Sequence, residues 1–317
     1  MKVSVIIVTR NTREMTLNCL DSLAEVLAAG RHEVIVVDNA SSDGTAEAIT
    51  ARYPQVTVLR EARNAGFSRA NNHGAQVATG ELILFLNSDT LASAAAVEAV
   101  AAAFAEEATL GAAIPQLVDA EGRSQLTVAH TPGPATLLSP AADDKAWARV
   151  AEAVARGEAL GAGYYLSGAA LMVRREAFAA VGGFDESFFL YYEDADLCTQ
   201  LTAQGWAIRL VAAATVVHRQ GGSTSRGLCT AVELARSRYQ YLCKHHGRAG
   251  ALAVAGVEVL ATARRALFST VDVLLTLGCW PKARRKAWLH SRLCLGFLLL
   301  PKRESRLYRV LFGDWHQ

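Results

Sequence analysis

The sequence has 317 residues, of which 51% are hydrophobic and 20% are charged. This balance supports a full hydrophobic core and excludes an intrinsically disordered chain. The net charge of +2 hides an asymmetry, since residues 1–225 hold 16 basic and 25 acidic side chains whereas residues 226–317 hold 16 and 5. The basic C-terminal third predicts attraction to an anionic surface, either a membrane or a nucleic acid.

The six cysteines show neither a CxxC pair nor the spacing of a zinc site, which favours free thiols in a reducing cytoplasm. They are Cys19, Cys198, Cys229, Cys243, Cys279 and Cys294. The apolar run near the N-terminus is too short for the core of a signal peptide and predicts a first strand. Charged residues interrupt every later apolar run well before the ~20 residues that a membrane-spanning helix needs.

Strands alternate with helices in the first part of the chain. Apolar runs predict strands over 3–8, 33–37, 56–60 and 82–86, and helical patterns predict helices over 14–28, 45–52 and from within 64–72 to about 78. This alternation is typical of βαβ units and a parallel sheet. The first strand is followed by TRNTRE, so the chain has neither the dinucleotide-binding fingerprint nor a P-loop there.

The second part of the chain is less regular. A helix over 92–105 and a strand over 112–118 precede a proline-punctuated stretch to about 163, and we expect a strand over 165–174, a helix over 193–204 and strands over 207–211 and 214–217. Basic residues then alternate with apolar helical runs. We therefore expect an α/β domain over 1–225, with a mixed, mostly parallel Rossmann-like sheet covered by helices on both faces, and a basic amphipathic helical extension over 226–317.

Asp89 follows the most apolar of the expected strands, ELILFLNSDT. A carboxylate at the carboxyl end of a buried parallel strand lies where open α/β sheets bind ligands. Aspartate is also a common N-cap, and a helix is expected to begin near Ala92. The segment alone leaves both interpretations open.

Other polar residues follow the same pattern. Asp38 and His218 also end expected strands, and carboxylate and imidazole groups suit Mg²⁺ or Mn²⁺. Glu193, Asp194 and Asp196 open a helix, where acidic residues favourably oppose the helix dipole. Three acids in four residues, directly after an aromatic run, exceed what capping requires.

At this point the ordered motifs resemble those of the family 2 glycosyltransferases with a GT-A fold, and most closely the rhamnosyltransferase-like branch that builds bacterial surface polysaccharides. The motifs are VSVIIVTRN, VIVVDNASSDGT, NAGFSRANNHG, GELILFLNSDT, ALMVRREAFAAVGGFDESFFLYYEDADLC and VVHRQGGST. They span about residues 1–225. The resemblance implies an enzyme that moves a sugar from a nucleotide-diphosphate donor to a hydroxyl of a saccharide acceptor.

The resemblance implies nucleotide-binding roles for Thr9, Asn11, Asp38, Asn64, Gly66, Arg69, Asn87 and Ser88. Asp38 would read the pyrimidine and ribose of a dTDP- or UDP-sugar. Gly66 permits close backbone approach, and Arg69 can pair with phosphate through two hydrogen bonds. Asn87 stands where the family has the first aspartate of a DxD motif, so the sequence departs from the family there and metal binding has one carboxylate fewer.

The resemblance further implies that Asp89 and His218 bind Mg²⁺ or Mn²⁺ and that Asp194 is the general base of an inverting displacement. Glu193, Asp196 and Tyr192 would bind the acceptor or support the base. Adjacent carboxylates are hard to separate without geometry, so Asp196 stays open as the base.

The basic extension has two interpretations. Basic helices rich in Leu, Phe and Trp typically lie in a membrane interface, which predicts a peripheral enzyme on the cytoplasmic face of the cell membrane with a lipid-linked acceptor. In the other interpretation, the extension packs on the catalytic domain or forms the interface of a homodimer. No nucleic-acid motif accompanies the charge, so we expect no nucleic-acid partner.

Two alternatives to a glycosyltransferase remain. A sugar-nucleotide nucleotidyltransferase needs a Gly-rich, basic loop after the first strand, and TRNTRE lacks it. A non-catalytic carbohydrate-binding scaffold is suggested only by Asn87.

Overall fold

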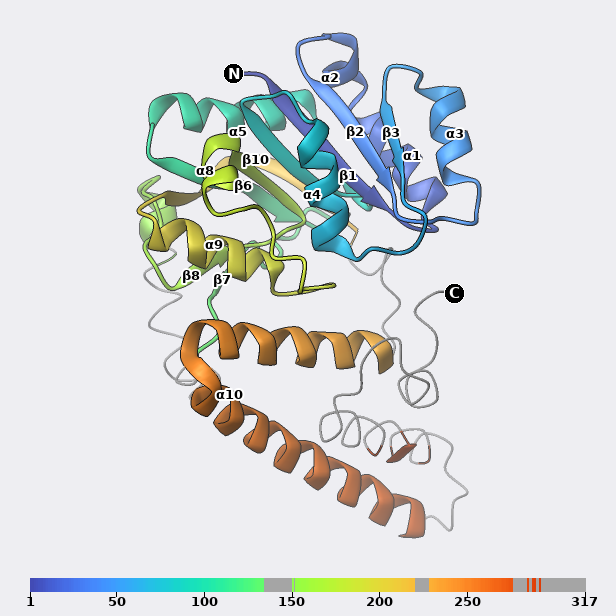
Figure 1. Ribbon diagram of the computed structural model, residues 1–317, viewed down its shortest axis with the longest axis vertical. Coiled ribbons are helices and arrows are strands. Elements are labelled where there is room, and N and C mark those ends of the chain that lie inside the picture. The colour runs from blue at the N-terminus through green and yellow to red at the C-terminus, as the bar shows by residue number, and fades with distance from the viewer. Residues whose placement is uncertain are drawn as a thin grey trace. The chain divides into compact units, whose positions relative to one another are not determined.

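The computed structural model in Figure 1 describes residues 1–133, 150, 152–219 and 228–275, together with 284, 287, 288 and 291. The chain divides into two units, one made of residues 1–131 and 141–224 and the other of residues 132–140 and 225–317. Each unit is described by itself below.

An eight-stranded sheet organises the first unit (Figure 1). Its strands, in spatial order, are β3 (Thr57–Arg60), β2 (Glu33–Asp38), β1 (Val3–Thr9), β4 (Leu82–Asn87), β9 (Ala170–Arg174), β6 (Leu110–Val118), β10 (Ala207–His218) and β5 (Thr90–Leu91). The first four run parallel, as do β6 and β10, whereas β9 is antiparallel to both β4 and β6. This confirms the predicted mixed α/β fold.

Helices connect these strands and pack against the sheet. They are α1 (Arg13–Ser22), α2 (Ala24–Ala28), α3 (Thr45–Arg52), α4 (Phe67–Val77), α5 (Ala94–Glu106), α8 (Arg175–Ala180) and α9 (Glu193–Ala203). Helix α4 contacts β1 and β2, and α5 contacts β6 and β10. Strand β4 is buried from Leu82 to Leu86, as its apolar run predicts, and the Phe85 ring lies 4.8 Å from that of Phe184.

Several predicted elements differ in their bounds from the elements of the structure. The strand expected over 165–174 is two strands, β8 (Tyr164–Leu166) and β9, in different sheets, because the small residues at 167–169 form a turn that apolar periodicity does not register. Strand β8 pairs with β7 (Val128–His130). The helix expected over 14–28 breaks at Leu23, and the two final strands are the single strand β10, irregular between Val211 and Thr215.

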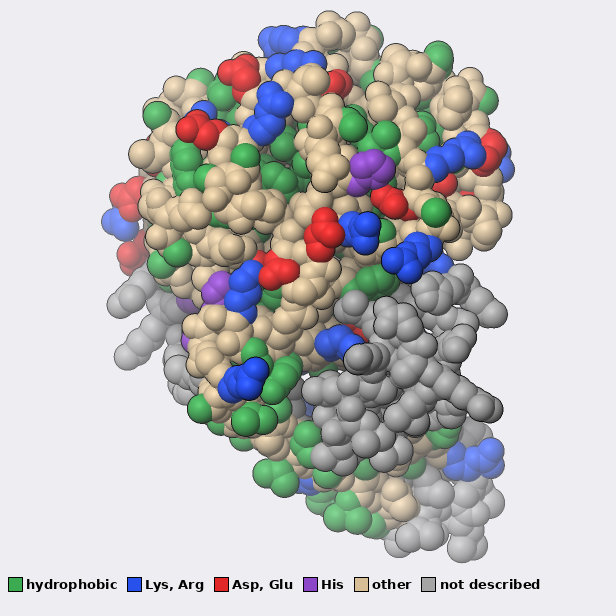
Figure 2. Space-filling view, in the orientation of Figure 1, with side chains coloured by type: hydrophobic (Ala, Val, Ile, Leu, Met, Phe, Trp, Pro, Cys, Tyr) green, Lys and Arg blue, Asp and Glu red, His purple; other side chains and the backbone are tan. Residues whose placement is uncertain are grey.

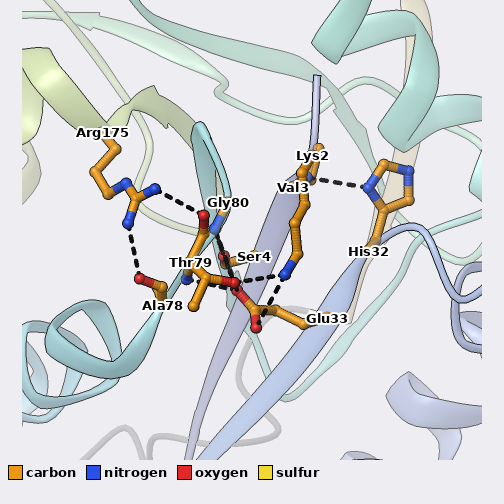
Figure 3. Close-up of polar contacts among 9 residues, drawn as sticks. All are labelled: Lys2, Val3, Ser4, His32, Glu33, Ala78, Thr79, Gly80 and Arg175. Carbon is orange, nitrogen blue, oxygen red and sulfur yellow. Dashed lines mark hydrogen bonds and ion pairs between the residues drawn. The ribbon is translucent and has the colours of Figure 1, made fainter.

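A polar cluster joins the amino ends of β1, β2 and β4 (Figure 3). The Glu33 carboxylate accepts hydrogen bonds from the Ser4 hydroxyl and from the Thr79 and Gly80 amides, the amides at 2.6 and 3.2 Å. The Lys2 ammonium lies 3.5 Å from the second oxygen. Burial raises the pKa of Glu33, but the hydrogen bonds from Ser4 and Thr79 outweigh it and lower the pKa to about 2.

Glu33 should therefore stabilise the fold above about pH 4.5, where the unfolded-state carboxyl is ionised, and should lose this contribution as the pH falls toward 2. We expect Glu33→Gln to lower the free energy of unfolding at pH 7 by about 1–3 kcal/mol, since the Thr79 and Gly80 amides lose a charged acceptor. The substitution should also reduce the loss of stability in acid. Urea unfolding between neutral and acidic pH measures both effects. The exposed Glu25→Gln is the matched control, and equal pH dependence of wild type and Glu33→Gln would contradict the assignment.

The second unit contains helix α10 (Leu228–Leu275), in which Gly247 has a non-helical backbone with φ of 74°. Beyond it, large apolar side chains are exposed at Leu252, Val257, Leu260, Leu267, Phe268 and Val271. Arg248, Arg264 and Arg265 are exposed on the same stretch. Most of the basic residues after 275, with Cys279, Trp280 and Cys294, lie outside the described residues.

Within the described ranges, no helix combines the length and apolar character needed to cross a membrane.

Candidate active site

Asp89 and His218 meet beyond the end of β4. The short strand β5 pairs antiparallel with the end of β10, with Thr90 opposite His218, and the Arg219 amide donates to the Asp89 carbonyl at 2.9 Å. This pairing brings His218 Nε2 to 3.5 Å from Asp89 Oδ1. Asp89 is only 3% exposed, so its carboxylate is held in a fixed and largely dry position.

The helix-cap interpretation of Asp89 is excluded by the position of α5. That helix begins at Ala94 rather than near Ala92, and its N-cap is Ser93, whose hydroxyl accepts a hydrogen bond from the Ala96 amide at 3.2 Å. Asp89 therefore does not cap α5.

The Asp89–His218 pair fits a divalent cation. Oxygen ligands lie about 2.0–2.2 Å from Mg²⁺ or Mn²⁺, so neighbouring ligand atoms are about 3 Å apart, close to the observed 3.5 Å. No cluster of three or more His, Cys, Asp or Glu side chains suited to a metal occurs in the described part of the chain. These two residues are thus the candidate protein ligands found there, in keeping with the asparagine at position 87.

Asp194 is fixed by the turn between β8 and β9. Its Oδ2 accepts a hydrogen bond from the Gly168 amide at 2.9 Å, and its Oδ1 accepts one from the Ala195 amide at 2.8 Å. The same turn reaches the other part of the site, because the Asn87 amide donates to the Ala169 carbonyl at 2.9 Å. Two consecutive residues of one turn therefore connect Asp194 to the strand that leads to Asp89.

The three acidic residues at the start of α9 differ in accessibility. Glu193 is 5% exposed and Asp196 is fully buried, with its carboxylate bonded to Gln200 Nε2 at 2.8 Å, whereas Asp194 is half-buried. Asp194 is the least buried residue of the three, which favours it over Asp196 for contact with an acceptor. Tyr192, beside them, has a left-handed backbone with φ of 66°.

Burial sets the protonation of this cluster. It raises the pKa of Asp194, and the hydrogen bonds from Gly168 and Ala195 offset part of that rise. Burial and the neighbouring Asp194 charge raise the pKa of Glu193 well above its ordinary value. An aspartate with a raised pKa is a stronger base than an exposed one, which suits proton abstraction near neutral pH.

The loop over residues 64–66 is held by Asn39, a residue that the motif analysis did not single out. Asn39 Nδ2 donates to Asn64 Oδ1 at 3.1 Å and to the Gly66 carbonyl at 3.2 Å, while its Oδ1 accepts from the Ala65 amide at 2.7 Å. The preceding Asp38 is buried at the end of β2 and accepts a hydrogen bond from the Ser41 amide at 3.0 Å. The loop is thereby fixed beside Asp38.

Gly66 brings this loop against the segment that precedes α9. With φ of 85°, its position favours glycine, and a Cβ there would lie 2.7 Å from Phe189 Cδ2 and 2.8 Å from the Phe189 carbonyl oxygen. The Phe67 amide donates to that carbonyl at 2.7 Å. Arg69, in the first turn of α4, is exposed, with its Nε 3.9 Å from Glu186 Oε2.

Thr9 and Ser88 are buried, and each contacts a threonine that follows β1. The Thr9 hydroxyl is 2.7 Å from that of Thr16, and Thr12 Oγ1 lies 3.2 Å from Ser88 Oγ. Asn11 is exposed and accepts a hydrogen bond from the Ser42 amide at 2.8 Å, which joins the loops that follow β1 and β2. The predicted nucleotide-binding residues thus divide into exposed Asn11 and Arg69, half-buried Asn64 and Asn87, and buried residues that shape the loops.

Comparisons with known proteins place the chain among sugar-transferring enzymes. A family model described as Glycosyl transferase family 2 matches residues 4–182. The N-acetylglucosaminyl-diphospho-decaprenol L-rhamnosyltransferase of Mycobacterium tuberculosis is 31% identical over 234 residues, which cover 67% of this chain and 75% of that protein. The O-antigen biosynthesis protein RfbC of Myxococcus xanthus is 29% identical over 70% of this chain and 18% of its own length.

Among solved structures, the mannosyltransferase PcManGT of Pyrobaculum calidifontis, in complex with GDP-Man and Mn²⁺, is similar with a TM-score of 0.57 and 20% identity. The match covers 94% of this chain and 86% of that one. This likeness shows the fold.

Proposed function

Because the chain belongs to glycosyl transferase family 2, we propose that its site transfers a sugar from a nucleotide-diphosphate donor with inversion of configuration, using Asp194 as base and a divalent cation at Asp89 and His218. The observation that carries the proposal is the turn at Gly168 and Ala169, which joins the Asp194 carboxylate to the strand that leads to Asp89. Family membership decides against the nucleotidyltransferase alternative.

The transfer is a single displacement. The acceptor oxygen forms a bond to the anomeric carbon, the bond from that carbon to the diphosphate oxygen breaks, and the electron pair leaves with the nucleoside diphosphate. Asp194 takes the proton of the acceptor hydroxyl as its oxygen attacks. One base and no covalent intermediate are required, so the configuration at the anomeric carbon inverts.

Charge on the leaving diphosphate needs stabilisation. Mg²⁺ or Mn²⁺ held by Asp89 and His218 would supply positive charge there. Arg69, exposed at the start of α4, adds a guanidinium that can pair with phosphate through two hydrogen bonds. The loop at 64–66, fixed by Asn39, and Asp38 bind the nucleotide in this proposal, with Thr9, Asn11, Asn87 and Ser88 shaping the surrounding loops.

The substrates are proposed by similarity. The mycobacterial relative is by name an L-rhamnosyltransferase that acts on N-acetylglucosaminyl-diphospho-decaprenol. We infer a pyrimidine nucleotide-linked donor such as dTDP-rhamnose and a lipid-linked saccharide acceptor, in the synthesis of a bacterial surface polysaccharide or cell-wall glycan. Glu193, Asp196 and Tyr192 support the base or the acceptor.

A panel of dTDP-, UDP- and GDP-sugars tests the proposal. Donor binding and slow donor hydrolysis should be detectable with a dTDP- or UDP-sugar in the presence of Mn²⁺, and dTDP-rhamnose should give the highest hydrolysis rate. Absence of binding to every donor would favour the carbohydrate-binding scaffold instead.

The second unit suits a membrane surface. At 100° per residue, Val257, Leu260, Leu267, Phe268 and Val271 fall within an arc of about 100° on α10, which is the apolar face of an amphipathic helix. Hydrophobic side chains are visible along this helix in Figure 2. Exposed Arg264 and Arg265 lie among or beside them, and arginines there would pair with anionic lipid head groups. We infer peripheral binding to the cytoplasmic face of the membrane, where a lipid-linked acceptor is found.

Replacing Leu260 and Leu267 together by aspartate should weaken binding to phosphatidylglycerol vesicles by roughly tenfold or more, because apolar burial is lost and negative charge is added. Vesicle co-sedimentation measures the affinity, and phosphatidylcholine vesicles report the lipid-charge dependence. Val77→Asp, at an exposed apolar position of α4, is the control. Unchanged vesicle binding by the double variant, or a monomer–dimer shift in its place, would favour the dimer interpretation.

A further inference from the structure

Gln125 makes two contacts with His218, a residue 93 positions away in the sequence. Its side-chain Nε2 lies 2.7 Å from the His218 carbonyl oxygen, and its Oε1 lies 3.2 Å from His218 Nδ1. The Gln125 backbone is itself fixed, since its amide donates to the Leu117 carbonyl at 2.8 Å and its carbonyl accepts from Gln116 Nε2 at 3.3 Å. The side-chain amide of Gln125 therefore contacts both the backbone and the ring of His218.

These contacts determine which ring nitrogen carries the proton. A backbone carbonyl can only accept a hydrogen bond, so the group of Gln125 that faces it must be the NH₂. The other end of the amide is then a carbonyl oxygen, which also can only accept, and His218 Nδ1 must donate to it. Nδ1 therefore carries a proton, and in the neutral ring this leaves the lone pair on Nε2, which is 3.5 Å from Asp89 Oδ1.

We infer that Gln125 is a positioning residue that holds His218 in the Nδ1–H tautomer, with Nε2 directed at a divalent cation shared with Asp89. This inference rests on the proposed metal role of the two residues. Metal-binding histidines typically donate their second ring N–H to an oxygen acceptor, and loss of that acceptor costs roughly 10–100-fold in metal affinity. A side-chain amide performs this role here, where a carboxylate or a backbone carbonyl is more usual.

The test measures dTDP binding to the full chain by calorimetry, with Mn²⁺ and with EDTA. Wild type should bind dTDP more tightly with Mn²⁺. Gln125→Leu, which keeps the side-chain size and removes both contacts, should lose roughly 10–100-fold of that Mn²⁺-dependent gain while binding dTDP in EDTA as wild type does. Gln125→Glu keeps an acceptor for Nδ1–H but loses the donor to the His218 carbonyl, so it should restore part of the gain. Gln204→Ala, an exposed glutamine outside the site, is the control.

A second measurement does not depend on metal. Two-bond ¹H–¹⁵N spectra of the metal-free protein distinguish the histidine tautomers, and wild type and Gln125→Glu should show Nδ1–H at His218 whereas Gln125→Leu should show a mixture. If Mn²⁺ has no effect on wild-type dTDP binding, the proposed metal role fails, and the tautomer spectra still decide whether Gln125 fixes the ring. If Gln125→Leu keeps both the Mn²⁺ gain and the wild-type tautomer, the inference is overturned.

Discussion

Replacement of Asp194 by asparagine is expected to lower the rate of sugar transfer by about 10²–10⁴-fold, because an amide cannot take the proton of the acceptor hydroxyl. Donor binding should survive, since asparagine keeps an acceptor oxygen for one of the two amides, Gly168 or Ala195, and the nucleotide loops lie on other strands. Single-turnover transfer with a saturating donor, together with calorimetric dTDP binding, separates the two effects.

Asp196→Asn is the matched control for this variant. Its carboxylate is fully buried and bonded to Gln200, so the substitution should change stability more than the chemical step. If Asp196→Asn abolishes transfer while Asp194→Asn remains active, Asp196 is the base. The pH profile adds an independent check: because burial raises the pKa of Asp194 and the base acts only when deprotonated, kcat/KM should fall on acidification at a pH above the ordinary aspartate range.

Asp89→Ala is expected to remove the response to Mn²⁺ and to lower transfer by roughly 10²–10³-fold, an effect of the size seen when one electrostatic stabiliser of a leaving group is lost. EDTA treatment of wild type should have the same effect and should be reversed by added Mn²⁺. Activity measured across a Mn²⁺ titration, with and without the substitution, gives the comparison.

Ser93→Ala distinguishes a site residue from a helix cap. Ser93 is the N-cap of α5, so its loss should lower the free energy of unfolding by about 1 kcal/mol and leave Mn²⁺-dependent transfer unchanged. Asp89→Ala should instead remove Mn²⁺-dependent transfer and leave the free energy of unfolding unchanged. Full activity of the Asp89 variant in EDTA would exclude a metal role for this residue.

Residues at the ends of single strands were predictable from the sequence. The apolar run before Asp89 identifies a buried strand, and parallel strands present their carboxyl ends at one edge of the sheet. The positions of Asp38 and Asp89 at this edge therefore follow from the local sequence pattern alone. The start of α9 also follows from the acids at 193–196, and the end of α4 lies close to the predicted residue 78.

Contacts across long sequence separations were not predictable in this way. Gln125, Asn39 and Gly168 act through partners 93, 25 and 26 positions away, and no local period records such pairs. Asn39 lies in a loop rich in turn residues, which was the only signal for it. Gly168 was hidden inside an apolar run that resembled one continuous strand.

The reversed direction of β9 has a consequence for variation in this enzyme. Because β9 is antiparallel to β4, the first residues of β9, and not the last, lie beside Asn87. The turn just before β9 therefore presents a main-chain N–H, that of Gly168, to Asp194. A side-chain scan cannot delete that donor, so position 168 should tolerate exchange to alanine, whose Cβ would meet Asp194 only at ordinary contact distance of 3.5 Å. Proline is the one residue that removes it. Natural selection on this turn should therefore act against proline more strongly than for any particular side chain.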